Sequence, residues 1–199
     1  MKTCLAILLI LVPLVSAEDH QVTETDYSVM SQLISTALPT DKSLTIYIWH
    51  QVERSEVYDY KAMEGFRKAF KHLDNTLFDG YNHRNWDRRS AVLLGDHFKL
   101  ARPTVFLTPE AMKKHLGREM DPGWWLNPTR LPSGGLVVRL SLPSYSPDGN
   151  RAFVFAALYQ RQRADQTYFL LKRGTLDEPW KIVEKVTWWS CETPDYTNR

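Results

Sequence analysis

The sequence has no apolar run long enough to cross a membrane. Its longest apolar run, residues 5–15, is far short of the ~20 residues that a spanning helix needs. Lys2 precedes this run, and small residues ending at Ala17 separate it from a polar segment. This pattern is typical of a secretory signal peptide, with a short membrane anchor as the alternative. We therefore expect residues 1–17 to be a cleaved signal peptide and residues 18–199 to form a single α+β domain, secreted or periplasmic and without a membrane span.

The sequence also has few cysteines and no large excess of acidic or basic residues. Cleavage after Ala17 removes Cys4, so the mature chain has no intramolecular disulfide, and Cys191 is expected to be a buried thiol. The alternatives for Cys191 are a bond to another chain and a reactive nucleophile. Lys and Arg number 25 against 23 Asp and Glu, and the basic cluster at 84–89 is interrupted by Asp87. Nucleic acid is therefore not an expected partner.

Motifs for catalysis and for cofactors are absent as well. The chain has no nucleophile elbow, zinc-protease motif, phosphate-binding glycine loop or CxxC pair, so we expect no cofactor and no metal. Weak catalytic candidates remain. Asp79, His83 and Asp87 are spaced to align acid, imidazole and acid along one helical face, and Cys191 would be the thiol nucleophile. The alternative for the first three is an exposed polar face.

The first half of the sequence alternates helical patterns with single strands. Apolar residues recur at helical spacing over 25–38, with Thr23 or Thr25 as the cap, and over 61–82, with a break near residues 74 and 75. Strands are expected at 44–52 and 104–107. Thr108 and Pro109 then indicate the start of a short helix over 109–116.

The second half has the pattern of strands alone. Strands are expected at 136–142, 151–159, 167–173 and 180–189, separated by turn signals that include the polar segment 160–166. Short connections favour a four-stranded antiparallel meander, packed against the helices of the first half. The strand at 151–159 is apolar on both faces and is expected at the centre of the sheet, with helices on one face. The expected core includes Val154, Ala156, Leu158, Leu170, Ile182 and Val186, whereas Arg139, Ser141, Lys185 and Thr187 indicate exposed flanking strands.

Aromatic residues are abundant by contrast. Seven Trp occur, and four of them form two adjacent pairs, at 124–125 and 188–189. Adjacent residues of a strand point to opposite faces, so one Trp of a pair can remain exposed and receive a sugar or a protein. Core packing is the alternative. The ligand-binding candidates from this pattern are Trp124, Trp125, Trp189 and Tyr145.

Residues 77–190 resemble a group of short exported bacterial proteins whose role is not established. The shared pattern has a Leu-Phe-Asp helix start with a nearby Asn, a Thr-x-Glu helix start, a Trp segment, a Gly-Leu strand, an Ala-x-Val strand and a closing Trp-Lys-Ile-Val strand; its residues are Leu77, Phe78, Asp79, Asn82, Thr108, Glu110, Trp124, Trp125, Gly135, Leu136, Ala152, Val154 and Trp180. The resemblance implies an exported α+β domain without known catalytic residues. The sequence departs from the group at 160–166, where members often carry a Cys- and Gly-rich turn.

These observations favour an exported, non-catalytic binding or accessory protein of unknown ligand, with an envelope or extracellular protein or a glycan as partner. The alternative is an extracytoplasmic hydrolase acting on an envelope or extracellular substrate. The two predict different geometries: a nucleophile and base within hydrogen-bond reach in one cavity for the hydrolase, and scattered candidates for the binding protein.

Overall fold

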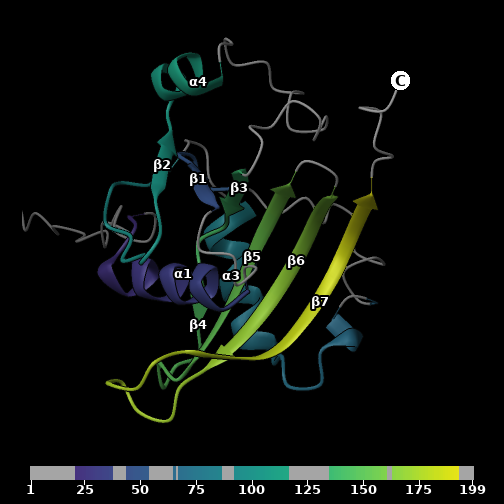
Figure 1. Ribbon diagram of the computed structural model, residues 1–199. Helices are drawn as coiled ribbons and strands as arrows, with labels where there is room; N and C mark the ends of the chain where they lie inside the picture. The colour runs from purple at the N-terminus through teal and green to yellow at the C-terminus, as the bar shows by residue number, and fades with distance from the viewer. Residues whose placement is uncertain are drawn as a thin grey trace, which may run out of the picture.

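The computed structural model describes residues 21–37, 44–53, 65, 67–86, 92–116, 135–160 and 163–192. The predicted signal peptide, Asp87, Trp124 and Trp125 lie outside these residues. Three labelled helices occur in the described part: α1 (Glu24–Ala37), α3 (Asn75–Trp86) and α4 (Pro109–Leu116). Figure 1 shows them around one sheet, whose strands are β1 (Thr45–Trp49), β2 (Thr104–Leu107), β3 (Gly135–Leu140), β4 (Ser144–Tyr145), β5 (Arg151–Gln160), β6 (Arg163–Lys172) and β7 (Lys181–Glu192).

The seven-stranded sheet is mixed. Its order is β2-β1-β3-β5-β6-β7, and the short β4 pairs with β5. β1 pairs in parallel with β2 and β3, whereas every pair from β3 to β7 is antiparallel. The α+β class is confirmed. The sheet is larger than the predicted four-stranded meander, because long connections after β1 and β2 allow parallel strands to join it.

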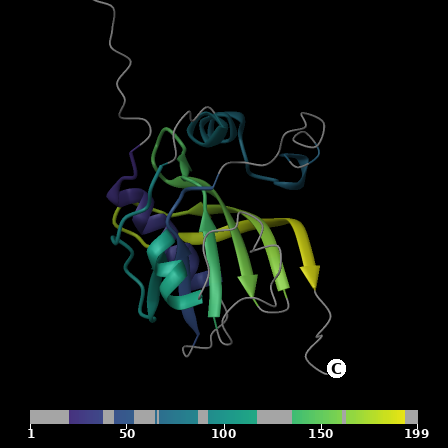
Figure 2. The ribbon, with the colours of Figure 1, turned by 90° about the horizontal axis from the view of Figure 1, so that it is seen from above.

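Helices cover both faces of the sheet, which corrects the expectation of helices on one face. On one face, α1 packs in a core (the α1 core) that includes Met30, Leu33, Ile48, Val138, Val154 and Phe169. On the other face, α3 packs in a second core (the α3 core) that includes Leu77, Tyr81, Val137, Phe153, Tyr168 and Leu170. Figure 2 shows α3 beyond that face. β5 is central as predicted, and its alternate residues supply both cores.

Local capping determines where the helices begin. Thr23 accepts a hydrogen bond from the Asp26 backbone N–H at 3.2 Å, and Thr108 accepts one from the Ala111 N–H at 3.2 Å, so α1 and α4 have the predicted caps. Asp74 accepts a hydrogen bond from the Leu77 N–H at 2.9 Å. Asp74 therefore starts α3, and the predicted helix over 61–82 is interrupted at the predicted break.

Two predictions about the second half are wrong. The polar segment 160–166 is mostly strand rather than turn, because β5 and β6 stay paired as far as Gln160 and Arg163. The strand of Arg139 and Ser141 is not an exposed flanking strand, because β3 lies between β1 and β5. Ser141 is fully buried, since its hydroxyl accepts a hydrogen bond from the Phe155 N–H at 2.9 Å, and the Arg139 side chain is only 13% exposed. Of the predicted core, Val154, Ala156 and Leu170 are buried, whereas three members are only partly buried: Leu158, Ile182 and Val186.

The edge strand β7 is longer than its neighbour. β6 has 10 residues and β7 has 12, and their pairing shifts register between Gln166 and Thr167 and between Leu170 and Leu171. The extra residues of β7 at these two bulges are Trp188 and Val183. Bulges bend a strand and increase its twist. In Figure 2 the yellow β7 accordingly runs across the direction of the green strands, and its N-terminal part contacts α1 through the partly buried Ile182.

Candidate functional site

The predicted catalytic residues do not meet in the described part of the chain. Asp79 and His83 lie one turn apart on α3, and both are exposed beside a cavity of about 720 Å³ next to β4, here called the α3 cavity. Cys191 is half-buried on β7, where it pairs with Ala164 of β6. The thiol lines none of the cavities described below. Imidazole and thiol are therefore not assembled as a base and a nucleophile.

A buried ionic cluster forms the wall of the α3 cavity. Asp26 is fully buried, and its carboxylate accepts hydrogen bonds from the Arg84 guanidinium at 3.0 Å for each oxygen and from the Tyr145 hydroxyl at 2.8 Å. Burial, and then the Asp26 charge, raise the pKa of Tyr145 above its usual range. The cluster joins α1, α3 and β4 and engages the Asp26 carboxylate, whereas Asp79 and His83 line the same cavity outside this cluster.

The predicted aromatic ligand site is divided between distant strands. The Tyr145 ring lies on β4, and its hydroxyl is engaged by Asp26. Trp189 is 40% exposed on β7, where it pairs with Gln166 near the opposite end of the sheet. The structure therefore does not bring Tyr145 and Trp189 together.

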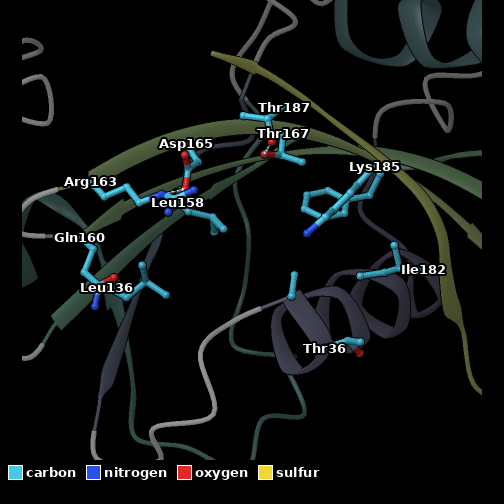
Figure 3. Close-up of a pocket in the computed structure, with 12 residues that line it drawn as sticks. Thr36, Leu136, Leu158, Gln160, Arg163, Asp165, Thr167, Ile182, Lys185 and Thr187 are labelled. Carbon is cyan, nitrogen blue, oxygen red and sulfur yellow. Dashed lines mark hydrogen bonds and ion pairs between the residues drawn. The ribbon is translucent and has the colours of Figure 1, made fainter. Parts of the chain in front are cut away.

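A different cavity lies between the curved end of the sheet and the C-terminal end of α1. We call it the α1–β7 cavity; its volume is about 580 Å³, in the range of small-molecule sites. Its apolar lining comes from α1, β3, β5, β6 and β7: Ala37, Leu136, Leu158, Phe169 and Ile182. Its polar lining comes mainly from β6 and β7: Thr36, Gln160, Arg163, Asp165, Thr167, Lys185 and Thr187. Figure 3 shows these side chains around the open space.

Strand alternation explains this polar lining. Arg163, Asp165 and Thr167 are separated by two residues along β6, so they share one face of the sheet. They continue the face whose buried residue further along β6 is Phe169. α1 covers the apolar part of this face and ends at Ala37, so the polar part lies open beside the end of the helix.

Most polar groups of the cavity are paired with one another. The Arg163 Nε donates to the Asp165 Oδ2 at 2.6 Å, and the Ser190 hydroxyl donates to the Asp165 Oδ1 at 2.7 Å. The hydroxyls of Thr167 and Thr187 are hydrogen-bonded at 3.1 Å. The Asp165 charge is thus balanced by Arg163. The charges on this side of the cavity are therefore paired.

Lys185 is the remaining charged side chain of the lining. It lies on β7 opposite Phe169 of β6, and Figure 3 shows its ammonium group extending into the space between the sheet and α1. Among the described residues, no carboxylate forms an ion pair with Lys185. The described lining of the cavity therefore combines apolar side chains, hydroxyl groups and one positive charge without a described counter-charge.

The described lining of this cavity carries apolar, hydroxyl, amide and charged side chains. Among its described lining residues there is no Cys, Ser or His, and hence no thiol or serine nucleophile beside an imidazole base. Over the described ranges, no group of three or more His, Cys, Asp or Glu is placed to hold a metal ion. None of the described helices has the length and apolar character needed to cross a membrane.

Sequence reasoning missed this site. The sequence pattern predicts only that Lys185 and Thr187 are exposed, as they are, and it predicts a turn at 160–166. The polar residues at 163, 165 and 167 carry a period of two, which is a signal for a strand with one polar face. The bending of β7 toward α1 has no comparable signal, because it depends on pairing between strands.

Comparisons with known proteins add no assignment to this geometry. No protein-family model, no curated protein and no solved structure matches this chain.

Proposed function

We propose that this chain is an exported, non-catalytic binding protein that holds a small molecule in the α1–β7 cavity. The observation that supports this most is the cavity itself, in which apolar side chains from five elements face an uncompensated lysine. A concave site with an apolar lining and a few convergent polar groups is typical of small-molecule binding. The lack of a nucleophile beside a base in its lining favours binding over catalysis.

Export is the second part of the proposal. It is supported by the pattern of residues 1–17, in which a basic residue, a short apolar run and small residues occur in order. The compartment would be the bacterial periplasm or the medium, and the ligand or partner would come from the envelope or the extracellular fluid.

Thermal denaturation of residues 18–199 with a panel of neutral, acidic and basic small molecules tests the binding proposal. A ligand that binds only the folded state stabilises it by RT ln(1 + [L]/Kd), so Tm increases with the logarithm of the ligand concentration once that concentration is above Kd. Thr36→Trp places an indole at the mouth of the cavity on an exposed helical position, and should abolish the increase in Tm.

Ser35→Trp is the matched control, because Ser35 is exposed on the same helix and does not line this cavity. The Ser35→Trp variant should show the same ligand-induced increase in Tm as the wild type. A ligand that stabilises the Thr36→Trp variant as much as the wild type would place binding elsewhere. A panel without any stabilising ligand would count against the proposal.

A hydrolase is the second candidate, because Asp79 and His83 both line the α3 cavity. Turnover of ester, peptide or glycan substrates that is lost in His83→Ala would support it and overturn the non-catalytic proposal. Asp148→Ala is a suitable control, since this exposed carboxylate lies in a turn away from the α3 cavity. We expect no turnover by any of the three proteins.

A further inference from the structure

We propose that the ligand of the α1–β7 cavity is an amphipathic anion, whose acidic head binds Lys185 and whose apolar body lies on the sheet. This inference rests on the proposed binding function and adds the chemical class of the ligand. The ligands of this class share a carboxylate or phosphate head group on a chain of several methylene groups.

The charge balance of the cavity favours an anion. The part of its lining that the structure describes has two cationic side chains, Arg163 and Lys185, and a single carboxylate, Asp165. Because Asp165 is paired with Arg163 at 2.6 Å and with Ser190 at 2.7 Å, it does not compensate Lys185. A bound anion would complete the pairing and form a charge-assisted hydrogen bond with the ammonium group.

The position of Lys185 determines where in the cavity the acidic head group of the ligand binds. The lysine lies opposite Phe169, and its neighbours on the same face of β7 are Ile182 and Thr187. Thr187 shares a hydrogen bond with Thr167, so the two hydroxyls form a polar rim beside the ammonium group. The head group therefore lies between Lys185 and this rim.

The apolar lining accounts for the body of the ligand. Leu158 and Ile182 are only partly buried although they pack against the α1 core, because each faces the cavity. A methylene chain that covers them removes their exposed surface from water, worth roughly 25 cal/mol per Å². A small inorganic anion would leave this surface uncovered, so the geometry favours an amphiphile.

The test is calorimetric titration of residues 18–199 with decanoate, decyl phosphate, decanol and decyltrimethylammonium at low and high salt. We expect decanoate and decyl phosphate to bind more tightly than decanol by about tenfold, the range of a hydrogen bond to a charged group. This preference should decrease at high salt, because ions screen a partly exposed charge. The ratio of the affinities for decanoate and decyl phosphate distinguishes a carboxylate ligand from a phosphate ligand.

Lys185→Gln removes the charge and retains a side chain of similar length. It should reduce the affinity for the two anions to that for decanol and leave the affinity for decanol unchanged. Lys181→Gln is the matched control, because Lys181 is an exposed lysine of the same strand that does not line the cavity. It should retain the preference for anions.

The outcomes separate the ligand class from the binding function. Equal binding of decanol and decanoate, or tighter binding of decyltrimethylammonium, would overturn the anionic class and leave a binding cavity. If Lys181→Gln also lost the preference for anions, that preference would come from the overall charge of β7. This result would overturn the proposed role of Lys185 as well. No binding by any of the four would overturn the amphipathic class, while the panel with Thr36→Trp would still decide the binding function.

Discussion

Asp26 shows how one residue can join three elements. Its carboxylate is fully buried and accepts hydrogen bonds from Arg84 of α3 and Tyr145 of β4, and from the Thr23 N–H at 2.8 Å. A buried charge is tolerated only when it is paired and hydrogen-bonded, and removing one partner leaves the other uncompensated. The position of α1 on the sheet therefore depends on a polar contact as well as on the α1 core.

Asp26→Asn should lower the free energy of unfolding by about 3 kcal/mol, because it leaves the Arg84 guanidinium without its counter-charge. Urea denaturation at neutral pH measures the loss. Glu24→Gln is the control, since the Glu24 side chain is 75% exposed in the same helical turn, and its effect should stay within about 0.5 kcal/mol. Similar losses in the two variants would contradict the structural role of Asp26.

Tyr145 predicts a dependence on alkaline pH. Its pKa is raised in the folded state, first by burial and then by the Asp26 charge, so the folded protein holds a proton that the unfolded chain releases near pH 10. The stabilisation is fully present below the unfolded pKa and is lost as pH rises above it, by about 1.4 kcal/mol per pH unit for one proton.

Urea denaturation of wild type and Tyr145→Phe between pH 8 and pH 11 tests this dependence. At pH 8 the wild type should be the more stable by about 1 kcal/mol, the contribution of one hydrogen bond. The difference should decrease above pH 10 and then reverse. A constant difference over the whole range would show that the Tyr145 proton is not linked to folding.

At the scale of elements, the turn between β4 and β5 has a specific backbone requirement. Gly149 has φ of 68°, in the left-handed region, and its carbonyl oxygen accepts hydrogen bonds from Arg173 at 3.1 and 2.9 Å. Arg173 in turn lies 4.3 Å above the Trp180 ring. The turn therefore helps to position the segment that leads into β7.

Gly149→Ala should lower the free energy of unfolding by about 1–2 kcal/mol, because a Cβ is strained in the left-handed region. Thermal and urea denaturation measure the change. Gly65→Ala is the matched control: no atom lies within 4 Å of an added Cβ, and the helical backbone there favours Ala. A Gly149→Ala variant as stable as Gly65→Ala would contradict the requirement.

The bounds of elements with strong local signals can be predicted from the sequence. The pairing of strands in the sheet cannot. The strand 104–107 and the helix 109–116 have the predicted bounds. Thr108 caps the helix and Pro109 is its first residue, so these two neighbouring residues mark where the strand ends and the helix begins. The parallel pairing of β1 with β2 and β3 joins residues far apart in sequence, and no local pattern encodes it. Leu158 illustrates the limit, since the sequence predicts its strand but not the cavity beside it.

At the scale of the whole molecule, export predicts a shortened chain. In a host that secretes it, the protein should begin at Glu18, because Ala17 is the small residue that signal peptidase requires before the cleavage site. N-terminal sequencing of the exported fraction measures this directly. A chain that begins at Met1 in that fraction would contradict cleavage. Ala17→Leu should retain the longer form, whereas Ser16→Leu, which leaves Ala17 in place before the cut, should not.

The two bulges of β7 have a consequence for the range of ligands. β7 spans with 12 residues the ladder that β6 spans with 10, so the outer strand can follow its neighbour only along a curved path. The surplus of residues determines how far the edge of the sheet bends toward α1. Val183 is one of the surplus residues and does not line the α1–β7 cavity. Deleting this residue should straighten β7 and change the width of the cavity without replacing any described side chain of its lining, so the proposed binding site could change in size while its charged groups stay the same.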